Sequence, residues 1–557
     1  MRKIIDGTPS TMNDEYQLNL HKILHHAAKV HDEVEVISYR TLQGGGVYTM
    51  NYSMIYERVC KMANALEDLG VNAKDRVAIL GWNDHRYFES YFSVSGVGAV
   101  LVQLNSRLHR DELAYIVKHS DSKALFLDET LIPLAEALAE KHNFEFFVIM
   151  SDKSELASKL KPVYYYEELI KEYPKKRSWP EIDERSAATA CYTQGTTGMP
   201  KGVFYSHRAL ILHMLVSANM LSLNPTDVFL QIVPFYHVNG WGFHFACPAF
   251  GVKLVLPGMY NPVHLANIII NEKVTIAPAA PAILIPMLEV FRRIEPNIDL
   301  RNLRLVSGAN EPPLAMQRGY ARIGAKVIHA YGATEATPLI SINVAKPQIL
   351  KLDEEAQWEH MKKQGLIIFG IEAKLVNPST SEEVPWDGKS LGELWVRGPW
   401  VIKEYYQDPR SKESVTEDGW WRTGDAGTID ELGYFQILDR LKDLIKSGGE
   451  WISSLNLETV LMKHPYVLEA VVIGVQHPRW GERPLALVVL KDQYKGKPKD
   501  VIEKDLKQFL LGKFAEWQVP DRILFIDEIP RTSVGKINKR LLREKYRDYY
   551  LRLEVNP

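Results

Sequence analysis

The sequence predicts an α/β fold in which a large N-terminal domain, built of two similar α/β halves and a small β-barrel, precedes a smaller α/β C-terminal domain. Three observations predict it. The 557 residues exceed one ordinary hydrophobic core, so two or three domains are expected. Short apolar strands alternate with amphipathic helices in two stretches of the chain, and a segment rich in Gly and Pro turns separates them from the C-terminal part.

The first α/β half begins at Arg76. Strands are predicted at 77–80, 99–104 and 124–127, and helices at 86–97 and 110–119. Short apolar strands separated by helices are typical of a parallel sheet covered on both faces. The same pattern returns at 274–276 and 303–306, which predicts a second, similar half.

The β-barrel is predicted at 367–438, where short strands are separated by turn pairs such as Asn377-Pro378 and Asp387-Gly388. Beyond it, strands at 470–475 and 485–490 and a helix at 499–511 form a compact α/β region. We therefore expect an N-terminal domain over 1–438 and a C-terminal domain over 439–557.

Composition excludes several classes of protein. Apolar residues make up 46% of the chain and charged residues 24%, the balance of a folded globular protein. The positive charges of 67 Lys and Arg nearly balance the negative charges of 69 Asp and Glu, so the net charge does not indicate a nucleic-acid partner. The three cysteines, Cys60, Cys191 and Cys247, lie far apart, which argues against a disulfide scaffold and predicts a reducing, cytoplasmic location.

No targeting or membrane segment is predicted. Residues 1–20 are polar and mixed in charge, unlike a signal peptide. The most apolar stretch, 228–257, is interrupted by prolines and glycines and carries His237 and Asn239, so it makes a poor transmembrane segment. A buried pocket wall is the better interpretation.

The strongest motif is Tyr-Thr-Gln-Gly-Thr-Thr-Gly-Met-Pro-Lys-Gly-Val at 192–203, between two predicted strands. Glycines let the backbone approach an anion closely, hydroxyl and N–H groups donate to phosphate oxygens, and a lysine adds charge. A Gly- and Thr-rich turn is the plain alternative. The order of residues differs from the P-loop of common NTPases. The predicted phosphate-binding residues are Thr193, Gln194, Gly195, Thr196, Thr197, Gly198 and Lys201.

Four further strings follow in order: Tyr-Gly-Ala-Thr-Glu at 331–335, Trp-Arg-Thr-Gly-Asp at 421–425, Asp-Arg-Leu-Lys-Asp at 439–443 and Pro-Arg-Thr-Ser-Val-Gly-Lys at 530–536. Together with the phosphate motif they resemble the adenylate-forming superfamily of acyl-CoA synthetases, luciferases and peptide-synthetase adenylation domains. The resemblance covers nearly the whole chain and is greatest to fatty acid–CoA ligases. It implies an AMP-forming acid–CoA ligase that uses ATP, Mg²⁺ and coenzyme A as a cosubstrate.

The resemblance also implies roles for single residues around the nucleotide. Tyr331 would stack on adenine, with Gly332, Ala333 and Thr334 beside it. Glu335 would hold Mg²⁺, a hard cation that prefers carboxylate oxygen. Asp425 would accept from the ribose hydroxyls. Ser307, Gly308 and Ala309 form a weaker match to the loop beside the adenine.

The C-terminal domain is expected to be mobile by the same resemblance. Asp439 would be its hinge, and Arg440 would reach the ribose or a phosphate. Lys536 would stabilise charge as the carboxylate attacks the α-phosphorus, together with Thr193, Glu335 and His237 in catalysis. A basic surface around Lys536 is the plain alternative. Lys446, Gly448, Gly449 and Trp451 would line the pantetheine tunnel of CoA, where a tight hairpin is the competing interpretation.

The acid pocket is expected around 234–241, with His237, Trp241, Phe243, Ala333 and Thr334 as substrate-binding residues. No acidic residue occurs between Asp227 and Glu272, so an α-amino acid, whose ammonium group needs a partner, is not the expected substrate. The neighbouring apolar side chains favour a medium- to long-chain fatty acid.

Several alternatives stay open at this stage. The same chemistry could act on a short-chain or hydroxylated acid of three to six carbons, or could transfer the acyl group to a carrier protein. A non-catalytic acyl- or nucleotide-binding protein and a luciferase-type oxygenase are further alternatives, because fold does not fix function. A homodimer is expected only by analogy with relatives.

Overall fold

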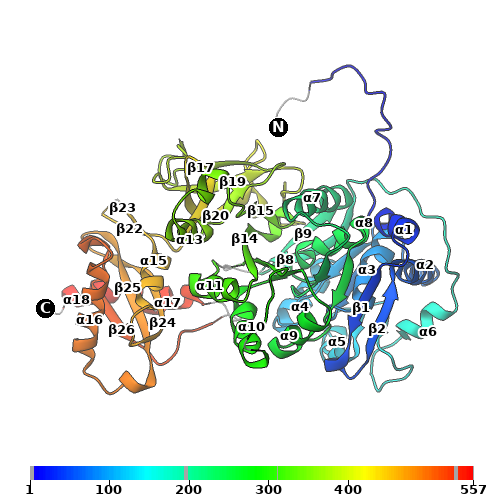
Figure 1. The fold of residues 1–557 in the computed structure, drawn as a ribbon, viewed down its shortest axis with the longest axis horizontal. Helices are drawn as coiled ribbons and strands as arrows, with labels where there is room; N and C mark the ends of the chain where they lie inside the picture. The colour runs from blue at the N-terminus through cyan, green and yellow to red at the C-terminus, as the bar shows by residue number, and fades with distance from the viewer. Residues whose placement is uncertain are drawn as a thin grey trace. The chain divides into compact units, whose positions relative to one another are not determined.

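The structure is a computed structural model that describes residues 5–193, 199–295, 297–309, 311–448, 450–531 and 537–555. It divides into two compact units. The first comprises Met1–Ala373, Val396–Trp421 and Gly433–Phe435, and the second comprises Lys374–Trp395, Arg422–Leu432 and Gln436–Pro557. Figure 1 labels the elements of both units.

A seven-stranded sheet forms the first α/β half, in the order β7-β6-β5-β3-β4-β8-β9. All neighbours are parallel except β8 and β9. The strands are β3 (Arg76–Leu80), β4 (Val100–Gln103), β5 (Ala124–Asp128), β6 (Phe146–Met150), β7 (Val163–Tyr165), β8 (Ala187–Thr193) and β9 (Lys201–Ser206). The helices of this half are α1 (Leu20–Val30), α2 (Tyr52–Asp68), α3 (His85–Gly96), α4 (Arg110–His119), α5 (Ile132–Ala139), α6 (Tyr166–Lys171) and α7 (His207–Met220).

The second half of the first unit repeats this architecture. Its parallel strands lie in the order β14-β13-β12-β10-β11-β1, and β2 pairs antiparallel with β1 at the end. The strands are β1 (Glu35–Tyr39), β2 (Val47–Asn51), β10 (Val228–Leu230), β11 (Lys253–Leu256), β12 (Ile276–Ala279), β13 (Arg304–Ser307) and β14 (Lys326–Gly332). The prediction of two similar α/β halves is confirmed.

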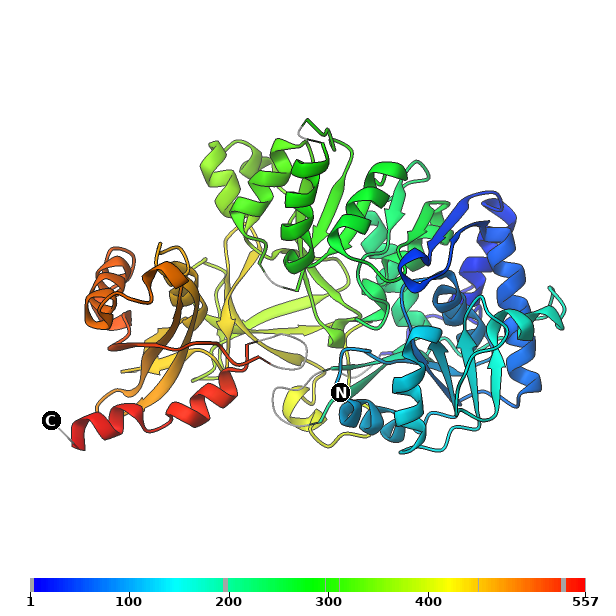
Figure 2. The ribbon, with the colours of Figure 1, turned by 90° about the horizontal axis from the view of Figure 1, so that it is seen from below.

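Three helices cover one face of this second sheet because each presents an apolar stripe to it. They are α9 (Pro262–Asn271), α10 (Pro281–Ile294) and α11 (Leu314–Arg322), which lie side by side in Figure 2. Ile269, Phe291 and Tyr320 represent the three stripes in one core cluster with Ala277 and Leu305 of the strands. The remaining helices of the unit are α8 (Ala246–Phe250), α12 (Pro347–Leu350), α13 (Glu354–Met361) and α14 (Ser411–Ser414).

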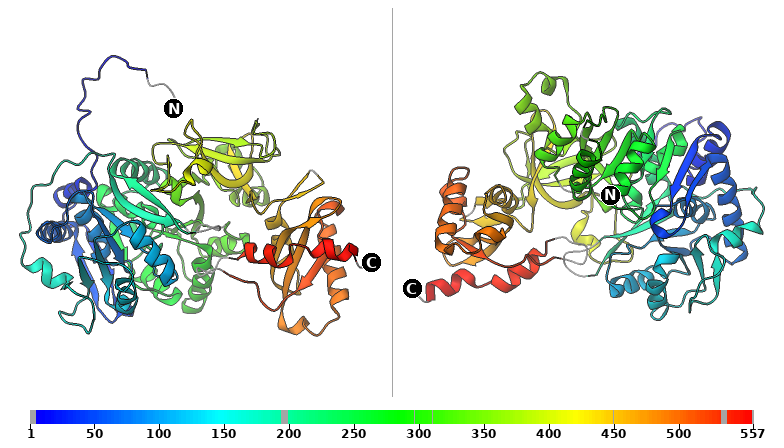
Figure 3. Two further views of the ribbon diagram at one scale, coloured as in Figure 1. Left: turned by 180° about the vertical axis from the view of Figure 1, so that it is seen from behind. Right: turned by 60° about the horizontal axis from the view of Figure 1, so that its bottom comes forward.

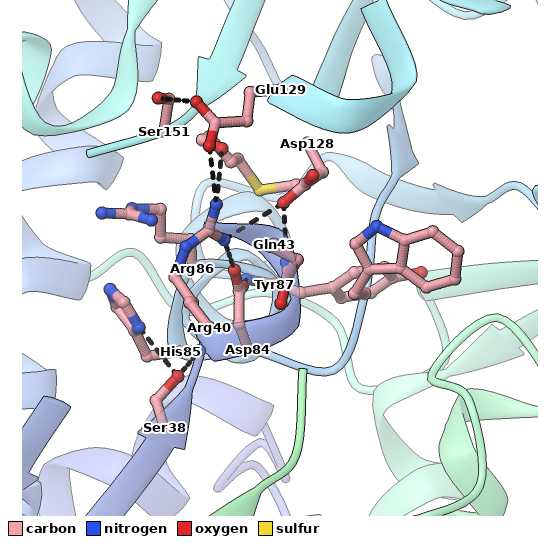
Figure 4. Close-up of polar contacts among 12 residues, drawn as sticks. Ser38, Arg40, Gln43, Asp84, His85, Arg86, Tyr87, Asp128, Glu129 and Ser151 are labelled. Carbon is pink, nitrogen blue, oxygen red and sulfur yellow. Dashed lines mark hydrogen bonds and ion pairs between the residues drawn. The ribbon is translucent and has the colours of Figure 1, made fainter. Parts of the chain in front are cut away.

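Buried charges join the two halves of the first unit (Figure 4). Arg40 follows β1 and is fully buried. Its guanidinium contacts the carboxylates of Asp84, which caps α3, and of Asp128, at the end of β5. Gln43 Nε2 also donates to Asp128, at 2.9 Å. Because a buried charge is stable only with partners, Arg40 fixes β1 of one sheet to α3 and β5 of the other.

The predicted β-rich segment contains the short strands β16 (Gly365–Ile367), β17 (Glu372–Val376), β18 (Glu383–Val384), β19 (Gly392–Arg397), β20 (Trp421–Ile429) and β21 (Tyr434–Arg440). β17 and β18 pair antiparallel. β15 (Leu339–Ile342) pairs antiparallel with β14 and β16.

The C-terminal region has helices on both faces of a five-stranded sheet, made of β22 (Ile445–Ser447), β23 (Glu450–Ile452), β24 (Val467–His477), β25 (Gly481–Leu490) and β26 (Arg522–Phe525). Side chains alternate along a strand. Val472 therefore packs with α15 (Ser454–Leu461) and α16 (Lys499–Leu511), whereas its neighbour Val471 packs with α17 (Lys539–Tyr546) and α18 (Tyr549–Val555). Figure 3 shows the last two helices along one face of the sheet. Among the described residues, no helix is long and apolar enough to span a membrane.

Candidate functional site

The predicted phosphate motif connects β8 to β9. Thr193 is the last residue of β8 and Lys201 is the first residue of β9, and the two lie opposite each other across the antiparallel pair. Gln194, Gly195, Thr196, Thr197 and Gly198 lie outside the described residues. The structure therefore places the two ends of the loop side by side, as a loop between paired strands requires.

Glu335 lies near Lys201, in the one-turn helix Thr334–Ala336. Its carboxylate Oε1 accepts a hydrogen bond of 2.7 Å from the Tyr405 hydroxyl. Lys201 Nζ lies 4.3 Å from the centroid of the same tyrosine ring, in a cation–π contact. Backbone bonds fix the turn, since Tyr205 Oη donates to Thr334 O at 2.8 Å and Ile402 N donates to Glu335 O at 2.8 Å. A half-buried carboxylate beside a lysine suits Mg²⁺ and phosphate oxygens.

Burial sets the protonation of this cluster. It raises the pKa of Tyr405 far above its ordinary value, with Glu335 adding to the shift, so the hydroxyl stays a donor. Burial also lowers the pKa of Lys201, and Arg410 lowers it further. Glu335 opposes that shift.

The segment from Tyr405 to Arg410 was not predicted from sequence to contribute to the site. Both terminal nitrogens of Arg410 donate to Met199 O, each at 3.2 Å, and its Nε donates to Asp408 at 2.8 Å. Tyr406 N donates to Gly202 O at 2.9 Å. The segment therefore binds the end of the phosphate loop as well as Glu335. These contacts join residues about seventy to two hundred positions apart, so no local pattern could reveal them.

The predicted adenine loop follows β13. A Cβ added to Gly308 would lie 2.9 Å from Cη2 of Trp241 and 3.0 Å from Ala330 O, so only glycine leaves room for the indole. Ser307 is buried, and its hydroxyl has no hydrogen-bond partner within the described part of the chain. Ala309 has φ 72°. The structure therefore brings Trp241, predicted for the acid pocket, against this loop.

Tyr331 and Gly332 are the last two residues of β14, where the pairing with β15 shifts in register. The Tyr331 ring is mostly buried, with its centroid 5.6 Å from that of Phe435. Ala333 N donates to Pro338 O at 3.0 Å. A Cβ on Gly332 would lie 2.2 Å from the same carbonyl oxygen, so this close backbone approach requires glycine.

The segment predicted to border the acid pocket contains five consecutive residues with positive φ, 238–242, which we call the left-handed turn. Their φ values are 47°, 55°, 56°, 66° and 74°. Two of the five are glycines, whereas Val238 and Trp241 adopt this region at a cost of roughly 1–2 kcal/mol each. His237, just before the turn, is exposed, with its ring 4.8 Å from that of Tyr236. Phe243 is buried and Trp241 is half-buried.

Buried amide side chains hold the left-handed turn, and sequence analysis missed them. Gln231 Nε2 donates to Val233 O at 2.7 Å and to Gly240 O at 2.9 Å. Gln103 Nε2 donates to Asn239 Oδ1 at 2.6 Å. Both glutamines are almost fully buried. A strained backbone conformation persists only where surrounding contacts hold it, and these hydrogen bonds are such contacts.

The second unit carries the predicted ribose and hinge residues. Arg440 Nε lies 2.9 Å from Asp425 Oδ1, so the two form an ion pair. The buried Asp439 carboxylate accepts from Ser454 Oγ at 2.6 Å and from Leu455 N at 3.1 Å, at the N-terminus of α15. A carboxylate at this position is stabilised by the free N–H groups of the helix.

The predicted CoA residues lie on the hairpin of β22 and β23. Lys446 and Trp451 are cross-strand neighbours, and Lys446 Nζ lies 5.1 Å from the indole centroid. Gly448 has φ 60°, and an added Cβ would lie 3.1 Å from the Trp480 ring. The hairpin, the alternative interpretation of this stretch, is therefore present. Gly449 and Lys536 lie outside the described residues.

Comparisons with known proteins agree with this architecture. The family model described as AMP-binding enzyme matches residues 24–406, and the model of the AMP-binding enzyme C-terminal domain matches 456–536. A long-chain-fatty-acid–CoA ligase of Thermus thermophilus is 41% identical over 98% of both chains. A medium-chain-fatty-acid–CoA ligase of Ectopseudomonas oleovorans is 38% identical, over 96% of this chain and 97% of its own. A 3-methylmercaptopropionyl-CoA ligase of Ruegeria lacuscaerulensis is 37% identical, over 95% and 98%.

Solved structures show the same fold. The o-succinylbenzoate CoA synthetase of Bacillus subtilis, in complex with its acyl-adenylate intermediate, aligns with a TM-score of 0.77 and 25% identity over 94% of this chain and 97% of its own. The ATP-bound MatB of Rhodopseudomonas palustris aligns with a TM-score of 0.80 and 24% identity over 96% and 100%, a likeness of fold. From its sequence motifs, its two-unit α/β architecture and these matches, the chain belongs to the AMP-binding enzyme family.

Proposed function

We propose that this AMP-forming acid–CoA ligase acts on a medium- to long-chain fatty acid. It joins the acid to ATP as an acyl-adenylate, with release of pyrophosphate, and then transfers the acyl group to CoA with release of AMP. Two relatives that align over nearly the whole chain are named long-chain and medium-chain fatty acid ligases. The apolar acid-pocket segment, without an acidic residue between Asp227 and Glu272, supports an alkyl substrate.

The observation that carries the proposal is that Lys201 contacts the ring of Tyr405 and Glu335 its hydroxyl, while Thr193 lies opposite Lys201 across the strand pair. Thr193 and Lys201 flank the phosphate motif, so we assign them to the phosphates of ATP. Glu335 would hold Mg²⁺, which neutralises phosphate charge as pyrophosphate leaves. Carboxylate attack on the α-phosphorus needs mainly alignment and charge stabilisation, and Lys536 is assigned to that role from its motif.

The remaining assignments are grouped by function. Ser307, Gly308, Ala309, Tyr331, Gly332, Ala333 and Thr334 would surround the adenine and the acyl carboxylate, and Asp425 and Arg440 the ribose. His237, Trp241 and Phe243 would form the acid pocket, and Lys446, Gly448 and Trp451 the pantetheine path. Residues 439–557 would move about Asp439 as a lid.

A second candidate substrate is a short or substituted acid. Two relatives at 37% and 38% identity are named 3-methylmercaptopropionyl-CoA ligases, nearly the identity of the medium-chain enzyme. A relative at 32% identity is named a 4-hydroxybutyrate–CoA ligase. The acid pocket therefore has to be tested with short and substituted acids beside straight-chain ones.

The test is a panel of straight-chain acids from two to eighteen carbons, with 3-methylmercaptopropionate and 4-hydroxybutyrate beside them. Pyrophosphate release and thioester formation are measured with and without CoA. The highest kcat/KM is expected for a medium or long chain, and no AMP from any acid would refute the proposed activity. Lys536→Ala should abolish adenylate formation and largely retain thioester formation from supplied acyl-adenylate. Equal loss in both steps would refute the role of Lys536.

We further propose a cytoplasmic homodimer. The three cysteines are free and buried, which fits a reducing compartment. Light scattering after size-exclusion chromatography measures the assembly directly, and a mass near 63.6 kDa would show a monomer instead.

A further inference from the structure

The segment from Tyr405 to Arg410 contacts the proposed nucleotide site at three separate places. Tyr405 Oη donates to Glu335 Oε1 at 2.7 Å, the Tyr405 ring faces Lys201 Nζ at 4.3 Å, and Arg410 donates twice to Met199 O at 3.2 Å. All of these residues belong to the first unit. One short stretch therefore contacts the carboxylate assigned to the metal, the lysine assigned to phosphate and the C-terminal end of the phosphate loop.

The hydrogen bond from Tyr405 restricts the orientation of the carboxylate. A hydroxyl that donates to Oε1 restricts the rotation of the carboxyl group, so fewer orientations are lost when the carboxylate binds a cation. Tyr405 is 5% exposed, so water competes weakly for its hydroxyl. Tyr405 N is itself held by Ser411 Oγ at 2.8 Å, and this bond positions the start of the segment.

The ring of Tyr405 acts on Lys201 at the same time. A lysine has four flexible carbons, and holding its ammonium group over an aromatic face reduces the conformations that it must lose when phosphate binds. The salt-linked Arg410 and Asp408 keep the segment rigid, since Arg410 Nε binds both carboxylate oxygens, at 2.8 and 2.9 Å. The two contacts of Tyr405 therefore couple Glu335 to Lys201 through one rigid side chain.

We propose that Tyr405 is a positioning residue, which aligns the Glu335 carboxylate for the divalent cation of ATP through its hydroxyl and holds Lys201 for phosphate through its ring. The inference rests on the proposed function, because it takes Glu335 as the metal ligand. The proposed role requires no contact between Tyr405 and the substrate. A substitution of Tyr405 should therefore change the affinity of the enzyme for the divalent cation even when no reaction takes place.

The experiment measures Mn²⁺ binding by electron paramagnetic resonance in the presence of α,β-methylene-ATP, whose bridge is not cleaved. Tyr405→Phe removes the hydroxyl and keeps the ring, and should weaken Mn²⁺ binding about tenfold, as expected for a lost charge-assisted hydrogen bond. The matched control is Tyr406→Phe, since the Tyr406 hydroxyl lies on the surface beside Gln407 and should not affect Mn²⁺ binding. Thermal unfolding of each variant checks that the fold is intact.

A double-variant cycle separates this inference from the proposed function. Glu335→Ala should weaken Mn²⁺ binding, and adding Tyr405→Phe to it should cause no further loss. If Glu335→Ala leaves Mn²⁺ binding unchanged, the metal assignment in the proposed function is wrong. If Glu335→Ala weakens binding but Tyr405→Phe does not, or if the two losses multiply in the double variant, the positioning role of Tyr405 is wrong.

The ring contact has its own readout. Tyr405→Leu removes both the hydroxyl and the aromatic face, so it should weaken binding of α,β-methylene-ATP without metal, measured by calorimetry in EDTA. Tyr405→Phe should leave that metal-free affinity unchanged, because the ring remains over Lys201. Equal metal-free affinities in both variants would overturn the proposed hold on Lys201.

Discussion

Replacing Gln231 with leucine should change the acid preference of the enzyme because the left-handed turn depends on this side chain. The Gln231 amide donates to Val233 O and Gly240 O. Val233 O also accepts from Asn83 Nδ2 at 2.8 Å, so the substitution leaves Gly240 O as the carbonyl without a side-chain donor, at a cost of about 1–3 kcal/mol. Val238 and Trp241 of the turn store roughly 1–2 kcal/mol each. The two ranges overlap, so relaxation of the turn can offset most of the loss.

We therefore expect Gln231→Leu to lower the free energy of unfolding by less than about 1 kcal/mol, since released backbone strain offsets the bond lost at Gly240 O. A relaxed turn would displace the Trp241 indole from Gly308. The relative kcat/KM across the acid panel should then change about tenfold between short and long chains, as a shift of about 1.4 kcal/mol in transition-state binding would produce. The affinity for ATP should not change.

Gln317→Leu is the matched control. This glutamine is 2% exposed and donates from α11 to Pro312 O at 2.8 Å. Gln317→Leu should lose about 1–3 kcal/mol, because no strained turn offsets the lost bond, and should keep the acid profile of the native enzyme. If Gln231→Leu also kept that profile while losing the full cost of one unsatisfied carbonyl, the turn would not have relaxed and the reasoning would be wrong.

Three further predictions concern the first unit. Arg40→Met should lower the free energy of unfolding by about 3–5 kcal/mol in denaturant titrations, because the carboxylates of Asp84 and Asp128 would be buried without their ion-pair partner. The control Arg292→Met, at an exposed ion pair, should lower it by less than about 1 kcal/mol. Equal losses in the two variants would contradict this prediction. Burial lowers the pKa of His213 to about 3. The unfolded chain therefore binds more protons below pH 6.5, and stability should fall as the pH decreases from 6.5, by up to about 1.4 kcal/mol per pH unit, a slope that His213→Asn should reduce. Gly308→Ala should alter the acid profile, because its Cβ would meet the indole of Trp241 at 2.9 Å, and an unchanged profile would show that the indole moves freely.

Elements whose signals are local could be predicted from the sequence. The helix predicted at 499–511 is α16, Lys499–Leu511, and the helix predicted at 86–97 is α3, His85–Gly96. In α16 the apolar periodicity decides which face is buried, whereas α3 is buried on all sides. The predicted strand 470–475 is the central part of the longer β24, and 485–490 is the C-terminal part of the longer β25, because cross-strand pairing extends both strands beyond their most apolar residues.

Contacts between distant residues could not be predicted. Thr193, Lys201 and Glu335 were predicted from motifs, but Tyr405, which contacts two of them, stands in a segment without any motif that the sequence analysis used. The sequence shows which residue types suit a reaction. The side chain that orients those residues can be identified only from the fold, which brings it next to them. Gln231 was missed for the same reason, because an isolated glutamine in an apolar stretch carries no signal of its partners.

The buried amides around the left-handed turn indicate that this geometry matters more to the protein than stability does. Leucine in place of Gln103 or Gln231 would fill the same space without desolvating an amide. Only a donor, however, can bind Gly240 O or Asn239 Oδ1 and so keep the backbone at positive φ. The turn holds Trp241 against Gly308, so the buried amides fix the position of the indole. A relaxed turn would be under less strain but would leave the wall of the proposed acid pocket undefined, and a pocket discriminates best between chain lengths when its wall has one position.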